Sequence, residues 1–283
     1  MKQVYKKPAA EKRFPKYFQI SDEIIYQFHN WIDIGNEPKI QKTSDVVYIA
    51  LAVRALNIYR SIVMLLEKDH WEDALILTRS IFELLLNIEE IQRDKTEIES
   101  KSRGFFLFYR LQEYLRSKAI DQYNIKTERK KKIEKIIAEE ERVAELLFNE
   151  FLIVNNKGKK RWSTSWCGKT ILELAKASAQ PIKESHYHIL YSYMSAFSHS
   201  APLSVMSTID SIDPQKELNE VQLAREKKEE EELKMVLFFS SCFILEVMLR
   251  VRDVIPDYDT KWNLQILSKI FHIWGFKPPT SPP

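Results

Sequence analysis

Two long apolar segments joined by a short turn constrain the fold of this chain more than any other feature. Residues 45–67 and 71–92 are apolar on nearly every side, and only Asp69–Trp71 is left to connect them. Apolar helices with so short a connection form an antiparallel hairpin. The sequence therefore predicts an all-α fold, a multi-helix bundle around this central helical hairpin, with Ser44 capping its first helix.

The other elements are predicted from apolar spacing and from helix breakers. A helix capped by Ser21 is expected over 21–33, and residues 153–166 read as a polar loop. A strand is conceivable only at 203–209, so no sheet is expected. Helices are further predicted over 104–120, 126–152, 169–178, 184–199 and 215–254. Because 126–152 and the first half of 215–254 are densely charged, they are expected as long charged helices with solvated faces at the periphery.

These elements predict one large helical domain. That domain consists of a core over 45–120 and 165–254 and of a charged helical insertion over 121–160. The expected boundaries are a basic N-terminal arm at 1–20, the domain at 21–254, and a C-terminal amphipathic segment with a Pro-rich tail at 255–283.

Composition argues against several classes of function. The chain has only five glycines and two cysteines, and it lacks the CxxC and HExxH patterns, so neither a metal nor a cofactor is expected. A net charge of +3 gives no strong attraction to nucleic acid or membrane. The apolar run Met235–Val251 is interrupted by Glu246 and Arg250, and it is read as a core helix without a membrane partner. The chain lacks an N-terminal apolar stretch, and the expected location is the cytoplasm.

Arg79 and Glu83 are the first candidate site residues. They lie four apart on one face of the apolar segment 71–92. Because buried charges require partners, each is expected to pair with the other or with a neighbouring helix. Two interpretations remain open, an ion pair that fixes helix register and a functional site. A polar stripe of Arg54, Asn57 and Ser61 either faces this pair, which makes Arg54 and Asn57 candidate binding residues, or marks the solvent side of its helix.

A second candidate group lies in residues 186–202. At helical spacing, one face of this segment is polar and carries five side chains, namely His188, Tyr191, Ser192, Ser195 and His199. Histidine is suited to proton transfer near neutral pH. His199, just before the Pro202 break, is the candidate general acid/base, and His188 is a candidate binding residue.

The residues Leu77-x-Arg79-Ser80-x-x-Glu83, Trp166-x-Gly168 and Tyr191-x-x-x-Ser195-x-x-x-His199 resemble a large microbial helical family known only as a domain of unknown function. The resemblance covers roughly residues 45–250. It implies a shared bundle and a shared polar cluster at Arg79, Glu83, Tyr191, Ser195 and His199.

The chain also resembles, more weakly, the higher eukaryotes and prokaryotes nucleotide-binding superfamily, whose members include RNases of toxin–antitoxin and antiphage systems. The signature of that superfamily is an arginine and a histidine separated by four to six residues. In this chain His199 occupies the histidine position, but Ser192, Tyr193 and Met194 stand where the arginine is expected.

Two functions remain as hypotheses. In the first, the chain is a binding or assembly module of a microbial defence or stress system, contacting a protein partner or a second copy through its charged helices. In the second, it is a metal-independent RNase or nucleotide-acting effector. There His199 transfers protons, Arg79 stabilises phosphate charge, and Glu83 orients either Arg79 or the His199 imidazole.

Overall fold

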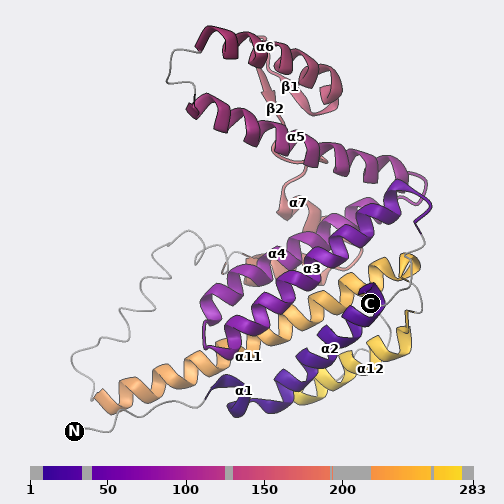
Figure 1. Cartoon of the computed structure of the whole chain (residues 1–283). Coiled ribbons are helices and arrows are strands. Elements are labelled where there is room, and N and C mark those ends of the chain that lie inside the picture. Colours follow the sequence, from indigo (N-terminus) through magenta and orange to yellow (C-terminus); the bar gives the residue numbers. More distant parts are fainter. Residues whose placement is uncertain are drawn as a thin grey trace.

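The structure of the protein is a computed structural model, and it describes residues 9–33, 40–124, 130–191, 193, 218–255 and 258–275. The predicted all-α bundle is confirmed (Figure 1). Helices α3, Thr43–Glu67, and α4, Trp71–Gln92, form the central hairpin. Helix α11, Leu218–Val251, lies against both of them. The bundle is thus built on three long helices, two of which the sequence places side by side.

The turn of the hairpin is stabilised locally and from a distance. Asp69 has a φ of 63°, a left-handed conformation that Asp tolerates better than most residues. Its carboxylate also accepts a hydrogen bond from Arg13. At the opposite end, α3 begins at Thr43, so the prediction of Ser44 as its cap is wrong. The Glu99 carboxylate accepts hydrogen bonds from the backbone N–H groups of Thr43 and Ser44 instead, at 3.0 and 3.1 Å.

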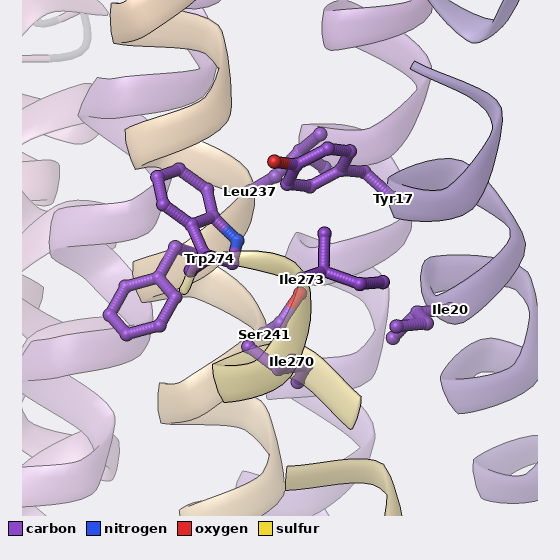
Figure 2. Close-up of a pocket in the computed structure, with 8 residues that line it drawn as sticks. Tyr17, Ile20, Leu237, Ser241, Ile270, Ile273 and Trp274 are labelled. Carbon is purple, nitrogen blue, oxygen red and sulfur yellow. The ribbon is translucent and has the colours of Figure 1, made fainter. Parts of the chain in front are cut away.

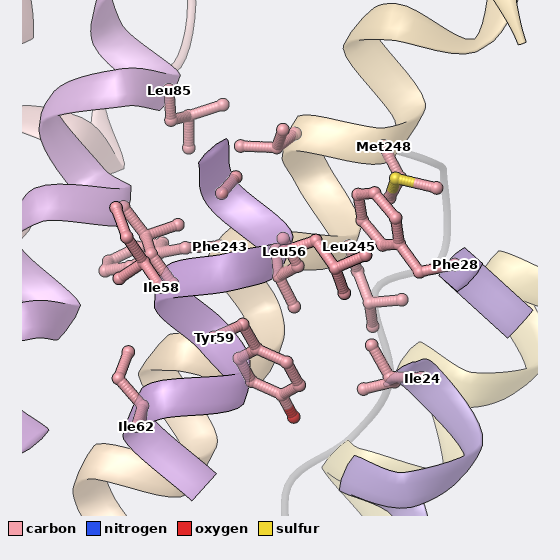
Figure 3. Close-up of a cluster of buried hydrophobic side chains, with 14 of the residues drawn as sticks. Ile24, Phe28, Leu56, Ile58, Tyr59, Ile62, Leu85, Phe243, Leu245 and Met248 are labelled. Atoms are coloured by element: carbon pink, nitrogen blue, oxygen red, sulfur yellow. The ribbon is translucent and has the colours of Figure 1, made fainter. Parts of the chain in front are cut away.

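The core lies between this three-helix layer and two helices that cover it. Helix α2, Pro15–Asp33, and helix α12, Thr260–Ile273, pack on α11 and on each other. Figure 3 shows Tyr59 of α3 at the centre, with Phe28 of α2 and Met248 of α11 close by. The Tyr59 hydroxyl lies 2.7 Å from the Ser241 Oγ and donates to the Ser21 Oγ at 3.1 Å. This buried polar group is therefore satisfied, as a low-dielectric interior requires.

The prediction of an extended basic arm over residues 1–20 is wrong for the described part, residues 9–20. Helix α1, Ala10–Arg13, leads directly into α2, which begins at Pro15 and not near Ser21. Phe14 and Phe18 are buried in the core because their spacing of four puts both on one helical face. Pro15 is compatible with a first helical turn, where no N–H donor is required. Ser21 lies inside the helix, where its hydroxyl donates to the Tyr17 carbonyl at 3.2 Å.

A helical arm projects from one end of the bundle (Figure 1). It consists of α5, Ile98–Asn124, and α6, Lys130–Leu147, followed by a 3-10 turn at Asn149–Phe151 and a hairpin of β1, Leu152–Val154, with β2, Lys160–Trp162. The strands are antiparallel, with Leu152 opposite Trp162. The loop predicted at 153–166 thus contains a short hairpin, closed by Gly158 at a φ of 71°. A separate small core of Leu111, Ala144, Phe148 and Phe151 stabilises the arm.

The segment that follows is less regular than predicted. Helix α7 spans Ile171–Lys176, and α8 spans Ile182–His186 and continues as a π-helical turn over Tyr187–Tyr191. The rest of the helix predicted over 184–199, apart from residue 193, and the strand considered at 203–209 lie outside the described residues. After α11, a 3-10 turn at Arg252–Val254 precedes α12, whose cap is the Asp259 carboxylate.

Helix α3 is long and apolar enough to cross a membrane by length and composition, and half of its most apolar window is buried inside the bundle. Its contacts with α4 and α11 are those of a core helix. Between α2, α11 and α12 lies a cavity of only about 10 Å³, closed by Tyr17 and Trp274, whose ring centroids are 5.5 Å apart (Figure 2). It has room for about one water molecule and not for an organic ligand.

Candidate functional site

Arg79, Glu83 and Tyr191 form one part-buried cluster between α4 and the π-helical turn. The Arg79 Nε donates to Glu83 Oε1 at 2.9 Å, and its Nη2 donates to the Tyr191 hydroxyl at 2.7 Å. The guanidinium carbon also lies 4.3 Å from the centroid of the Tyr191 ring, a cation–π contact. Burial, followed by the charge of Glu83, raises the pKa of Tyr191. Tyr191 is thus a neutral donor and acceptor that holds a cation over its ring.

The predicted pairing of Arg79 with Glu83 is present, and the predicted proximity to Tyr191 is present as well. Ser195 and His199 lie outside the described residues, so the predicted five-residue cluster remains a prediction for those two members. The π-helical turn at 187–191 also alters the geometry assumed from the sequence. Its wider turns rotate the chain by a smaller angle per residue than an α-helix, so face assignments made at α-helical spacing do not extend across it.

The other sequence candidates that the structure describes are exposed to solvent. The His188 side chain is exposed, and its Nε2 lies 3.8 Å from the Glu184 carboxylate. Arg54, Asn57 and Ser61 are exposed on α3, and the Ser61 hydroxyl donates to the Asn57 carbonyl at 3.0 Å. Of the two alternatives for this stripe, the structure shows the solvent-facing one. Arg54 and Asn57 therefore do not contribute to the Arg79 cluster.

A chain of buried charges lies at the junction of α4, α8 and α11. Lys183 is only 1% exposed and forms an ion pair and hydrogen bond with Glu246. Arg250 continues the chain, with its Nη2 3.6 Å from Glu246 and 3.1 Å from Glu89. Burial raises the pKa of Glu89, and this is partly offset by a hydrogen bond from Ser178. Two cations and two anions alternate, so the buried group is neutral overall.

His186 adjoins this chain of charges. Its ring lies edge-on to Phe82, Phe239 and Phe243, with centroids 5.6 to 6.4 Å away. Burial, followed by the positive charge of Lys183, lowers the pKa of His186 to about 4. Within the described part of the chain, its buried Nδ1 has no hydrogen-bond partner. His186 is therefore a neutral imidazole at physiological pH, in a mostly aromatic environment.

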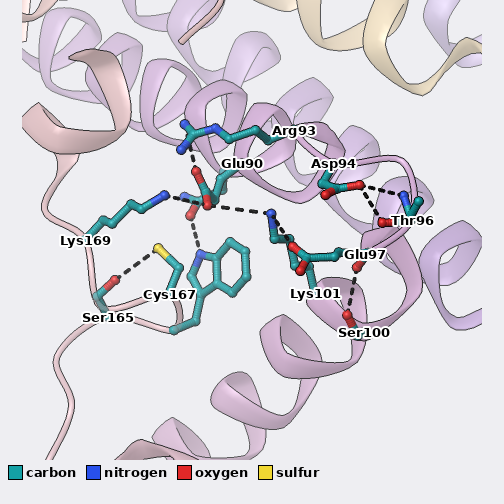
Figure 4. A network of polar contacts seen from close by, with 12 residues as sticks. Glu90, Arg93, Asp94, Thr96, Glu97, Ser100, Lys101, Ser165, Cys167 and Lys169 are labelled. Carbon is teal, nitrogen blue, oxygen red and sulfur yellow. Dashed lines mark hydrogen bonds and ion pairs between the residues drawn. The ribbon is translucent and has the colours of Figure 1, made fainter. Parts of the chain in front are cut away.

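A second polar network surrounds Glu90 at the end of α4 (Figure 4). Lys169 donates to Glu90 Oε1 at 2.8 Å, Arg93 lies 2.8 Å from Oε2, and Lys101 lies 3.9 Å from Oε1. Close by, the Trp166 indole donates to the Asn87 amide oxygen at 2.6 Å. The Trp166–Lys169 segment is thus anchored to α4.

The buried charges at Lys183, Glu246 and Arg250 are not predicted from the sequence, although the spacing of two of them is a signal. Glu246 and Arg250 lie four apart in an apolar helix, the same pattern that nominated Arg79 and Glu83. They were used only to argue against a membrane span. The charge run at 226–232 is predicted as a solvated face, but two of its glutamates contact other elements. Glu230 accepts a hydrogen bond from Arg13 at 3.1 Å, and Glu232 accepts one from the Tyr193 hydroxyl at 3.1 Å.

Several exposed apolar side chains lie on the arm. A group of them shares the outer part of the arm, and we call it the arm surface: Val143, Leu146, Leu147, Ile153 and Val154. Beside it, a groove of about 630 Å³ between α5 and α6 is lined by both apolar and charged side chains. Exposed apolar groups gathered in this way mark interaction surfaces.

A family model described as "Family of unknown function (DUF5677)" matches residues 45–217, more than half of the chain. The chain belongs to this family. The DUF5677 match begins at α3 and ends just before α11. It therefore includes Arg79, Glu83 and Lys183 but excludes Glu246, the buried partner of Lys183.

No curated protein and no solved structure matches the chain significantly. Among the described residues, no group of three or more His, Cys, Asp or Glu side chains is arranged to hold a metal ion.

Proposed function

We propose that this protein is an assembly module that pairs with a second copy of itself through the arm, in the cytoplasm, as part of a microbial defence or stress system. The observation that supports it is the arm surface, where Leu146 is 67% exposed on a helix far from the bundle core. An isolated arm leaves this apolar area in water, whereas a partner would bury it at a gain of roughly 25 cal/mol per Å².

The charge pattern of α6 favours a second copy over an unrelated partner. In the sequence, residues 130–138 contain four lysines and one glutamate, and residues 139–147 contain four glutamates and one arginine. If two copies of α6 lie antiparallel, each basic half faces an acidic half. A two-fold interface is self-complementary in this way, and such dimers are the commonest oligomers.

The apolar part of this proposal is tested by sedimentation velocity over a range of concentrations. The wild type should sediment as a dimer at micromolar concentration, and a Leu146→Lys, Leu147→Lys double variant should be monomeric. The matched control is Met64→Lys, because Met64 is 66% exposed on α3, away from the arm. A monomeric wild type, or equal loss of the dimer in the control, refutes the proposal.

The antiparallel arrangement is tested by reversing charges. Changing Lys130, Lys131 and Lys132 to Glu makes both halves acidic, and changing Glu139, Glu140 and Glu141 to Lys makes both halves basic. Each variant should lose the dimer, and a variant carrying both sets of changes should regain it. Failure of the combined variant to associate, while all three variants keep their helical content, counts against antiparallel pairing.

A second candidate function is metal-independent cleavage of RNA, or action on a nucleotide, as the weaker family likeness implies. It is supported by the Arg79–Tyr191 contact, which brings together two members of the predicted cluster. His199 would transfer the proton and Arg79 would stabilise phosphate charge. Toxicity of the wild type with cleavage of total RNA, both absent in a folded His199→Ala variant, is the expected result. Equal behaviour of the two proteins rejects this function.

A further inference from the structure

A groove between α8, α11 and α12 has the size and lining of a small-molecule site. Its volume is about 450 Å³, within the range of ligand pockets and too small for a packed helix. The apolar walls are both aliphatic and aromatic, and they consist of Ile182, Phe238, Phe239, Leu245, Leu249, Leu267 and Phe271. None of its described lining residues belongs to the arm or to the cluster of Arg79, Glu83 and Tyr191.

Four lining residues supply polar atoms, and none of them adds a free charge. Glu246 is already paired with Lys183 behind the wall. Asn263 is buried and donates its amide to the Leu245 carbonyl at 3.0 Å. Burial raises the pKa of the Cys242 thiol to about 12, so this group is neutral as well.

His186 is the polar lining group on which the inference rests. It lines the groove, and its buried Nδ1 has no hydrogen-bond partner among the described residues. Leaving a buried polar atom unpaired costs about 1–3 kcal/mol. A neutral imidazole offers one donor and one acceptor to a bound molecule. Because Glu246 is already paired with Lys183 and the imidazole stays uncharged, the groove offers no free charge to balance a charged ligand and favours a neutral occupant.

We infer that this groove binds a small, uncharged, mostly apolar molecule that carries one hydrogen-bonding group, such as an aromatic amine or a medium-chain alcohol. The apolar walls bury the apolar body of the ligand, and the imidazole of His186 meets its polar end. This site is independent of the proposed assembly through the arm.

The probe for the test is N-phenyl-1-naphthylamine, an uncharged aromatic amine whose fluorescence rises in apolar surroundings. The full chain should bind one molecule saturably. 1-Decanol should displace the probe at least tenfold more effectively than decanoate, because the groove has no unpaired cation to balance the carboxylate of decanoate. Binding without saturation, or equal displacement by the two competitors, overturns the inference.

The location is tested with a pair of matched variants. Ile182 is 52% exposed at the rim of the groove, and Ile120 is 53% exposed on α5, so both tolerate a charge without loss of folding. Ile182→Glu should weaken probe binding at least tenfold, and Ile120→Glu should leave it unchanged. Equal affinities in the two variants place the probe elsewhere and overturn the inference. The wild type could instead be a dimer that does not bind the probe. If Ile182→Glu dissociates that dimer, the groove is an interface between copies, and this result also overturns the inference.

Discussion

Removal of the Lys183 charge should destabilise the fold more than a change at almost any other charged residue. In the buried chain of charges, Lys183 and Arg250 balance Glu246 and Glu89. A Lys183→Met variant keeps an apolar side chain of similar length but leaves two buried carboxylates with one guanidinium. Because breaking a buried ion pair leaves an uncompensated charge, we expect a loss of about 3–5 kcal/mol, a large part of the ~5–15 kcal/mol that stabilises a typical protein.

The charge balance, and not the contact alone, should set this loss. Adding Glu246→Gln to Lys183→Met removes one anion along with the cation and leaves the Arg250–Glu89 pair intact at 3.1 Å. The double variant should therefore be more stable than Lys183→Met alone, and the complete double-mutant cycle with Glu246→Gln should give a coupling energy of at least about 1.5 kcal/mol.

Urea unfolding followed by far-ultraviolet circular dichroism measures these free energies. Lys176→Met is the control, since Lys176 is exposed and lies 3.9 Å from Glu184, and surface pairs of this kind contribute under about 1 kcal/mol. The reasoning fails if Lys183→Met is no less stable than this control, or if the double variant is as unstable as the single one.

Two further outcomes follow from the core. Because the pKa of His186 is about 4 in the folded chain and 6.5 as its ordinary value, only the unfolded chain takes up this proton between those limits. Stability should fall as the pH drops from 6.5 to about 4, and His186→Gln should flatten that part of the pH profile of urea unfolding; parallel profiles would contradict the assignment. Tyr59→Phe removes the hydroxyl beside Ser241 and leaves a buried polar atom unpaired, so it should cost about 1–3 kcal/mol in the same assay, and adding Ser241→Ala should recover part of the loss. An unchanged free energy in Tyr59→Phe would show that this hydrogen bond contributes nothing.

The errors in the predicted elements have a common origin. The extended arm was predicted from the lysines and prolines of residues 1–20, although Phe14 and Phe18 already had helical spacing. A short amphipathic segment becomes helical only where its apolar face can pack against the rest of the protein. Here that face packs against the core beside α11. The strands β1 and β2 were missed for a similar reason, because each is only three residues long and is stable only in its pair.

The sequence by itself determined the class of fold and the central hairpin, because an apolar period of 3.6 residues and a turn of a few residues admit few other arrangements. It also determined that Arg79 and Glu83 share a face, since residues four apart do so in any α-helix. Only the tertiary structure decided which charges meet across helices. Lys183 and Glu246 are 63 residues apart, and no local rule relates them. Their pairing depends on how α8 packs on α11, because a buried charge is stable only where the fold brings its counter-charge within reach.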